Sequence, residues 1–333
     1  MSTATSTGHW AGRNVVVTGC AGFIGSHFVE GLLARGASVL GLYRRDNRRV
    51  LSQLAADDRL RTVRLDLLDE AAVHEAVAGV PGGVDAVVHC AALTGNLTYR
   101  REHPATILDA NMRTVAVILN CARRHGVADI VLLSSGEVYL HATEHPTREE
   151  DDFRTAMRYA PDGYYLSKNY AEILAETYAQ EYGMRIFRPR LTSIYGPRDN
   201  FEPDTDRVVP QMFAKALAGE AIEIWGDGSQ TRTYLYVTDL VDATLQMVER
   251  NKHPVVNMGT PEAISPVQLA RSICAALGLP ERITFDRTRS GGRPNRTFDL
   301  SRLHEIIDFR PRTLQDGLRL TADWYREHRL QRA

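Results

Sequence analysis

The sequence has few cysteines, no long run of basic residues and no long hydrophobic segment. Its four cysteines, Cys20, Cys90, Cys121 and Cys274, are scattered without CxxC or zinc-like spacing, so the pattern predicts neither a disulfide framework nor a metal site. Such cysteine usage is typical of a reducing cytoplasm. The formal net charge of -1 and the lack of a basic run argue against a nucleic-acid partner.

No segment approaches the roughly 18 consecutive apolar residues of a membrane span, so we expect no membrane insertion. Residues 1–11 are polar, lack the apolar core of a signal peptide and are expected to form a flexible tail. The overall composition, 44% hydrophobic and 24% charged, is that of an ordinary globular protein. A chain of 333 residues is long enough for one large domain or two moderate ones.

The stretch from Asn14 to Ser26, NVVVTGCAGFIGS, predicts a buried strand, a tight turn and a helix. Glycines in the turn let a pyrophosphate approach the backbone N–H groups and the positive end of the helix. The spacing GxxGxxG differs from the GxGxxG fingerprint. Its position between a strand and a helix nevertheless favours dinucleotide binding over a purely structural turn. The predicted cofactor contacts here are Gly19, Gly22, Phe23, Ile24 and Gly25.

The next predicted strand, Ser38 to Tyr43, ends on Arg44 and Arg45. An acidic residue at this position would bind the ribose 2′-hydroxyl of NAD. Two arginines instead favour the 2′-phosphate of NADP, while Asp46 keeps NAD as the close alternative.

Strands and helices then alternate at short intervals, which predicts an α/β fold with a doubly wound parallel sheet. Right-handed crossovers place the carboxyl ends of the strands along one edge. At that edge we expect the Asp66 carboxylate and Leu67 beside the adenine, Ala91 and Ala92 under the cofactor, and Thr94 on the substrate side. The elements expected are strands Arg61–Leu65, Asp85–His89, Ile130–Leu133 and Pro254–Met258, and helices Asp69–Ala78, Pro104–His125 and Asn169–Glu181.

Three polar residues suggest hydride-transfer chemistry. Tyr164 and Lys168 are four residues apart and so share one helix face, where the ammonium favours the phenolate. Ser135 follows the fifth strand and is expected to hydrogen-bond the same substrate oxygen. Such a trio deprotonates a secondary alcohol while a nicotinamide takes the hydride, or in reverse reduces a ketone, and requires no metal. Tyr165 is the rival phenol, but Lys168 lies only three residues after it.

The sequence resembles the extended short-chain dehydrogenase/reductases, specifically the nucleotide-sugar epimerases and dehydratases. The resemblance covers nearly the whole chain and rests on TGCAGFIGSH, SSGEVY, YYLSK, RLTSIYGPRDN, GDGSQTRTYLYVTDLVDA and GGRPNRTFDLSRL. It implies catalytic roles for Ser135, Tyr164 and Lys168. It also implies that Arg232 and Arg293 bind the substrate diphosphate, and that 208–217 and 222–225 close over the nucleotide base.

The resemblance further implies a Rossmann domain at residues 12–193 and 234–260 and a nucleotide-sugar domain at 194–233 and 261–330. The family often dimerises through two helices, here residues 104–125 and 164–182, so a homodimer is expected.

Several residues depart from the family pattern. Ser193 replaces the usual asparagine of a substrate contact. Glu137 matches the base that acts at C5 in the 4,6-dehydratases, whereas Gly136 stands where many of them place a catalytic aspartate. The substrate half also resembles GDP-fucose synthase, and there Glu137 and Arg198 occupy the positions of the cysteine and histidine of its epimerisation.

These patterns favour a nucleotide-diphosphate-sugar epimerase/dehydratase that works through a 4-keto intermediate, with Tyr164 as the base. The alternative is an NADPH-dependent reductase of a nucleotide-linked 4-keto sugar, which needs no base at residue 137. A second alternative is a non-catalytic cofactor-binding protein of the same fold.

Overall fold

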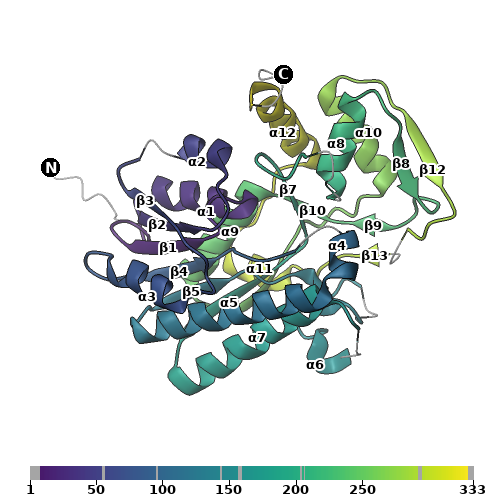
Figure 1. The fold of residues 1–333 in the computed structure, drawn as a ribbon. Coiled ribbons are helices and arrows are strands. Elements are labelled where there is room, and N and C mark those ends of the chain that lie inside the picture. The colour runs from purple at the N-terminus through teal and green to yellow at the C-terminus, as the bar shows by residue number, and fades with distance from the viewer. Residues whose placement is uncertain are drawn as a thin grey trace.

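The computed structural model describes residues 8–54, 57–94, 97–142, 145–156, 160–202, 205, 207–291 and 295–328. These residues form a parallel sheet covered by helices on both faces, beside a smaller lobe of helices and short strands (Figure 1). The arrangement confirms the predicted α/β fold with a doubly wound sheet. No helix in the described ranges combines the length and the hydropathy needed to cross a membrane.

The central sheet has seven parallel strands in the order β11-β6-β5-β4-β1-β2-β3. The chain builds outwards from β1 to β3 and then crosses back to β4, so the strand order reverses beside β1. In open parallel sheets a ligand binds at the carboxyl ends of the strands next to such a reversal. The strands are β1 (Asn14–Thr18), β2 (Ser38–Tyr43), β3 (Leu60–Arg64), β4 (Ala86–His89), β5 (Asp129–Leu132), β6 (Arg185–Leu191) and β11 (Val255–Met258).

Successive residues of β1 pack into two different hydrophobic cores because they point to opposite faces of the sheet. Val15 and Val17 belong to one core and Val16 to the other. This explains why β1 is a continuous apolar run. The first core is covered by α1 (Phe23–Ala34), α2 (Arg48–Leu54), α9 (Val237–Arg250) and α11 (Ser301–Ile306), and the second by α3 (Glu70–Ala78), α5 (Pro104–Arg124) and α7 (Gly163–Tyr182).

The smaller lobe has a third core, in which Phe213, Leu269 and Leu318 are fully buried. It begins where β6 ends, since only Thr192 separates β6 from the next strand. Its elements are β7 (Ser193–Tyr195), α8 (Val208–Leu217), β8 (Ile222–Trp225), β9 (Thr231–Arg232), β10 (Tyr234–Tyr236), α10 (Pro266–Leu277), β12 (Ile283–Asp286), β13 (Asn295–Arg296) and α12 (Leu314–His328). The lobe therefore lies beside the carboxyl edge of the sheet. Shorter elements elsewhere are α4 (Leu97–Glu102), the 3-10 turn η1 (Gly136–Tyr139) and α6 (Phe153–Ala156).

The predicted strands agree with the structure to within one residue at each end, and Ser38–Tyr43 agrees at both ends. One helix differs, because α7 begins at Gly163 and not at Asn169. Asp162 caps it: the side chain accepts hydrogen bonds from the N–H groups of Tyr164 and Tyr165, at 2.9 and 3.0 Å. Tyr164 and Lys168 thus lie inside the first two turns of the helix.

Strand β6 was not predicted, because two arginines interrupt its apolar residues. One of them, Arg190, is fully buried. Its guanidinium donates to Glu172 of α7 at 2.8 Å, to Asp152 at 2.6 Å and to the Tyr139 hydroxyl at 2.9 Å. Burial opposes the charge of Arg190, but the adjacent Glu172 carboxylate raises the pKa of the guanidinium above its ordinary value.

We expect Arg190→Met to lower the free energy of unfolding by about 3–5 kcal/mol, because it leaves the buried Glu172 carboxylate without its cation. A matched control, Arg319→Met, removes an exposed arginine of α12 and should cost less than about 1 kcal/mol. Urea denaturation of both variants measures the difference. Equal, small effects would show that the Arg190 network does not stabilise the fold.

Candidate active site

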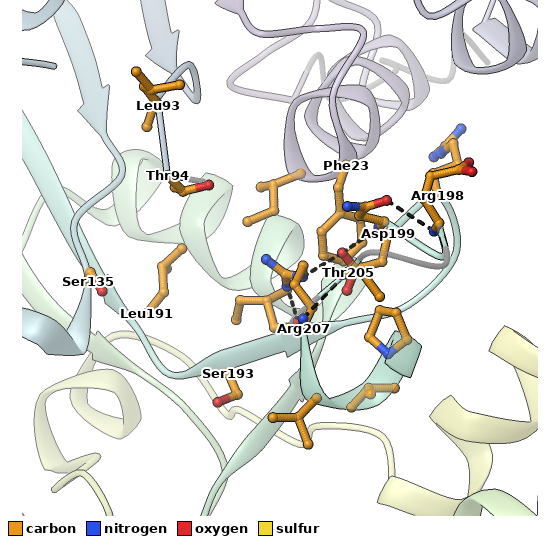
Figure 2. Close-up of a pocket in the computed structure, with 18 of the residues that line it drawn as sticks. Phe23, Leu93, Thr94, Ser135, Leu191, Ser193, Arg198, Asp199, Thr205 and Arg207 are labelled. Carbon is orange, nitrogen blue, oxygen red and sulfur yellow. Dashed lines mark hydrogen bonds and ion pairs between the residues drawn. The ribbon is translucent and has the colours of Figure 1, made fainter. Parts of the chain in front are cut away.

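A cavity of about 1420 Å³ lies at the carboxyl edge of the sheet and is lined by residues of both the sheet and the smaller lobe. Figure 2 shows Thr94, Ser135 and Leu191 on one side of it, with Phe23 and Arg207 facing them from the other. Ten residues predicted for the site line this cavity: Phe23, Ile24, Arg45, Ala92, Thr94, Ser135, Glu137, Tyr164, Ser193 and Arg198.

The glycine turn packs so closely that larger residues would disrupt it. A Cβ on Gly25 would lie 2.2 Å from the Gly19 carbonyl oxygen, and one on Gly19 would lie 3.1 Å from the Ala91 backbone. Gly19 also has a positive φ of 70°. Gly22 caps α1, and no described side chain caps the helix there. The N–H groups of the first turn, which have no acceptor within the helix, suit a pyrophosphate, so the turn fits the predicted dinucleotide.

The three predicted catalytic residues converge at the end of β5. The Lys168 ammonium donates to the Leu133 carbonyl oxygen at 2.6 Å and lies 5.6 Å from the centre of the Tyr164 ring. Ser135 caps η1, and its oxygen accepts a hydrogen bond from the Glu137 N–H at 3.2 Å. Ser135 and Tyr164 both line the cavity, while Lys168 does not.

Tyr165, the rival phenol, lies away from the cavity. Only 1% of Tyr165 is exposed, and its ring contacts the edge of the His141 ring at 5.7 Å between centroids. Of these two phenols, Tyr164 is therefore the one that a ligand in the cavity can reach.

Glu137 and Arg296 form an ion pair in the cavity wall. The two side chains meet at 3.1 Å, and 22% and 27% of their surfaces are exposed. Arg296 lies opposite Arg232 in the pairing of β13 with β9. Burial and the charge of Arg296 lower the pKa of Arg232. Two adjacent guanidiniums favour an anion beside them.

Gly136 has no space for a side chain. A Cβ built there would lie 2.4 Å from Cζ of Phe298 and 3.3 Å from the Leu191 carbonyl oxygen. An aspartate at this position would displace the Phe298 ring, which packs against Tyr139 at 5.5 Å between centroids.

The loop after β2 and the start of α2 carry exposed basic side chains. Arg45, Arg48 and Arg49 line the cavity, and Arg44 lies outside the lining and pairs with Asp66 at 3.5 Å. Asp66 also accepts a hydrogen bond from the Leu68 N–H at 3.0 Å. Neither Asp66 nor the buried Leu67 lines the cavity, although both follow β3 at the sheet edge. Ala91, also outside the lining, donates its N–H to Thr18 at 3.2 Å.

Arg198 lies in the cavity wall, but its guanidinium already binds residues of α1. It donates to the Glu30 carboxylate at 2.7 Å and contacts a ring nitrogen of His27 at 2.9 Å. Arg198 thus joins the smaller lobe to the cofactor helix. The other predicted diphosphate ligand, Arg293, lies outside the described residues.

Five arginines of the cavity wall had no predicted role, and two of them, Arg48 and Arg49, lie on α2. Arg100 stacks over the Tyr164 ring at 4.1 Å, Arg207 lies 5.4 Å from the centre of the Phe23 ring, and Arg296 pairs with Glu137. These contacts join segments that are distant in the chain. Neither the hydrophobic periodicity nor the spacing of motifs in the sequence therefore indicates them.

The model of the NAD dependent epimerase/dehydratase family matches residues 15–259. The chain is 49% identical over 319 residues to dTDP-4-dehydro-6-deoxy-D-allose reductase of Streptomyces bikiniensis, covering 96% of this chain and 98% of that one. It is 28% identical over 331 residues to GDP-L-fucose synthase of Escherichia coli (strain K12), covering 95% and 97%.

A solved structure with the same fold is that of DesIV, the dTDP-glucose 4,6-dehydratase of Streptomyces venezuelae, with NAD and TYD bound. Its TM-score is 0.81 at 27% identity, covering 96% of this chain and 98% of that one. These matches confirm the resemblance that the motifs indicate. The chain belongs to the NAD dependent epimerase/dehydratase family and is an NAD(P)-dependent nucleotide-sugar enzyme of the short-chain dehydrogenase/reductase type.

Proposed function

We propose that the protein is an NADPH-dependent reductase of a nucleotide-diphosphate 4-keto-6-deoxy sugar. The observation that carries this proposal is the 49% identity, over nearly the full length of both chains, to a dTDP-4-dehydro-6-deoxy-D-allose reductase. Of the activities that the sequence left open, the reductase is therefore preferred to the epimerase/dehydratase.

The site also supports reduction over dehydration. A 4,6-dehydratase needs a base at C5 and an acid for the departing hydroxyl, as the family pattern implies. Here Glu137 is paired with Arg296, and the contact of Gly136 with Phe298 leaves no space for an acidic side chain. A ketone reduction needs neither group.

In this proposal Tyr164 donates its phenolic proton to the C4 carbonyl oxygen of the sugar. A nicotinamide held at the glycine turn would supply the hydride to C4, so that the C=O double bond would become a C–O single bond with one new C–H bond and one new O–H bond. Ser135 hydrogen-bonds the same oxygen and fixes its position. Lys168 places a positive charge beside Tyr164, which stabilises the phenolate left after proton transfer.

The basic loop suits the 2′-phosphate of NADP. Arg45 lines the cavity, and Arg44 precedes it in the chain. Both residues follow β2, and the adenosine ribose of a dinucleotide binds at the end of this strand in this fold. Asp46 is tied to Arg48 at 3.2 Å, which makes it a weaker partner for the ribose hydroxyl of NAD.

On the substrate side we propose that Arg232 and Arg296 bind the diphosphate, with Arg293 as the family pattern implies. Thr94 and Ser193 then contact the sugar from opposite sides of the cavity, and α8 and β8 cover the nucleotide base.

The proposal also includes the predicted division into a cofactor domain and a substrate domain, the homodimer and the cytoplasmic location.

Incubation with a panel of nucleotide-linked 4-keto sugars and NADPH tests the activity. We expect NADPH oxidation and a product heavier by two hydrogens, while loss of water or an isomer of unchanged mass would contradict the reductase.

Tyr164→Phe should lower kcat by about 10²- to 10⁴-fold, since it removes the proton donor. The matched control Tyr165→Phe removes a buried phenol and should retain activity; equal losses in both variants would reject Tyr164 as the donor.

Arg45→Ala should raise KM for NADPH by about 10- to 100-fold, because hydrogen bonds to charged groups contribute about 1.5–3 kcal/mol. KM for NADH should change little, since NADH has no 2′-phosphate. Arg310→Ala, at a highly exposed arginine outside the cavity, is the control. A parallel rise for both cofactors would argue against recognition of the 2′-phosphate.

Glu137→Gln separates the reductase from a dehydratase. Loss of a general base lowers turnover by about 10²- to 10⁴-fold, whereas loss of a partner of Arg296 should act mainly on KM for the nucleotide sugar. We therefore expect kcat to stay within about tenfold of the unmodified enzyme. A collapse of kcat at unchanged KM would restore Glu137 as a base.

A further inference from the structure

Two histidines and a cysteine come together on the surface between α3 and the end of α5, away from the cavity. His74 lies on α3, Cys121 on α5, and His125 directly follows α5 as its C-cap. Their ligand atoms all lie within 4.8 Å of one another. In Figure 1, α3 lies beside the end of α5 opposite to α4. None of the three side chains lines the cavity.

The spacing of these residues places them on facing helix surfaces. Cys121 and His125 are four residues apart, as are Glu70 and His74, so each pair shares one face of its own helix. Nδ1 of His74 and Nε2 of His125 lie 3.1 Å apart. In a tetrahedral zinc site with Zn–N bonds of about 2.0–2.1 Å, two ligand nitrogens lie about 3.3–3.4 Å apart. For these two nitrogens a shift of a few tenths of an ångström would admit the ion, whereas the Cys121 sulfur, which lies within 4.8 Å of both, would complete the set by turning its side chain toward them.

We propose that His74, Cys121 and His125 bind a divalent metal ion of the zinc type and thereby join α3 to α5. Imidazole nitrogen and thiolate sulfur are the donors that Zn²⁺ prefers, and three protein ligands with a water in the fourth position make an acceptable set. Only 2% of Cys121 is exposed, whereas 18% of the His74 side chain is exposed, so the ion can enter from solvent.

Glu70 supplies the second observation in favour of a metal. Nε2 of His74 is buried and has no hydrogen-bond partner among the described residues. The closest carboxylate oxygen, Oε1 of Glu70, lies 3.6 Å away and is held by the Asn120 side chain at 2.7 Å. Metal-binding histidines commonly present the other ring N–H to a carboxylate, which fixes the tautomer. With Nδ1 of His74 on the metal, Glu70 is the carboxylate placed for this role, and a shift of a few tenths of an ångström would bring its oxygen into hydrogen-bond distance of Nε2.

Titration of the metal-free, full-length protein with Co²⁺ and then Zn²⁺ tests the site. We expect one equivalent of Co²⁺ to give a thiolate-to-cobalt charge-transfer band, which Zn²⁺ abolishes by displacement, and Zn²⁺ to raise the melting temperature. Cys121→Ser should remove the band. The same band in Cys121→Ser, or none in the unmodified protein, would overturn the proposal.

Two milder variants test the site if Cys121→Ser fails to fold. His125→Asn removes a partly exposed ligand, and Glu70→Gln should weaken Zn²⁺ binding by about 10- to 100-fold, as loss of an outer-shell partner does. Cys274→Ser, in the core of the smaller lobe, and His304→Asn, exposed on α11, are matched controls that should bind Zn²⁺ unchanged. Unchanged Zn²⁺ affinity in His125→Asn would also overturn the proposal.

Discussion

The buried charge of Arg190 is the constraint on which the catalytic side of the molecule depends. Its guanidinium binds Glu172, and Glu172 also accepts a hydrogen bond from Ser134 at 2.5 Å. Arg190, Asp152 and Glu172 are almost completely buried, so none of them can exchange its partner for water without a large desolvation cost. The network therefore holds β6, α7 and the turn after β5 in one relative position.

This constraint reaches the proposed catalytic residues through helix geometry. Tyr164, Lys168 and Glu172 follow one another at intervals of four residues and lie along one face of α7. Ser135 directly follows Ser134, whose hydroxyl binds Glu172. The same buried carboxylate thus positions both α7, which carries Tyr164 and Lys168, and the turn that carries Ser135. Lys168 adds a third connection, because it donates to the Leu133 carbonyl oxygen. Pre-organised groups of this kind need little movement to meet a substrate oxygen.

The sequence predicted the parts of the site that depend on local pattern. The glycine turn was recognisable because only residues without a Cβ fit between β1, α1 and Ala91. The strands were recognisable because apolar side chains on both faces give unbroken runs. Strand β6 was missed because the charges of Arg188 and Arg190 are neutralised by residues far along the chain. Arg296 and Arg207 were missed because their contacts with Glu137 and Phe23 join segments distant in the chain. The cluster of His74, Cys121 and His125 was missed because it comes from two separate helices.

The central claim is that this framework delivers a proton and a hydride across the C4 carbonyl of a nucleotide-linked keto sugar. Reduction with NADPH carrying deuterium at the transferred position of the nicotinamide tests it most directly. The account predicts one deuterium per product, bonded to C4 of the sugar. A product without the label, or with the label on another carbon, would contradict the account.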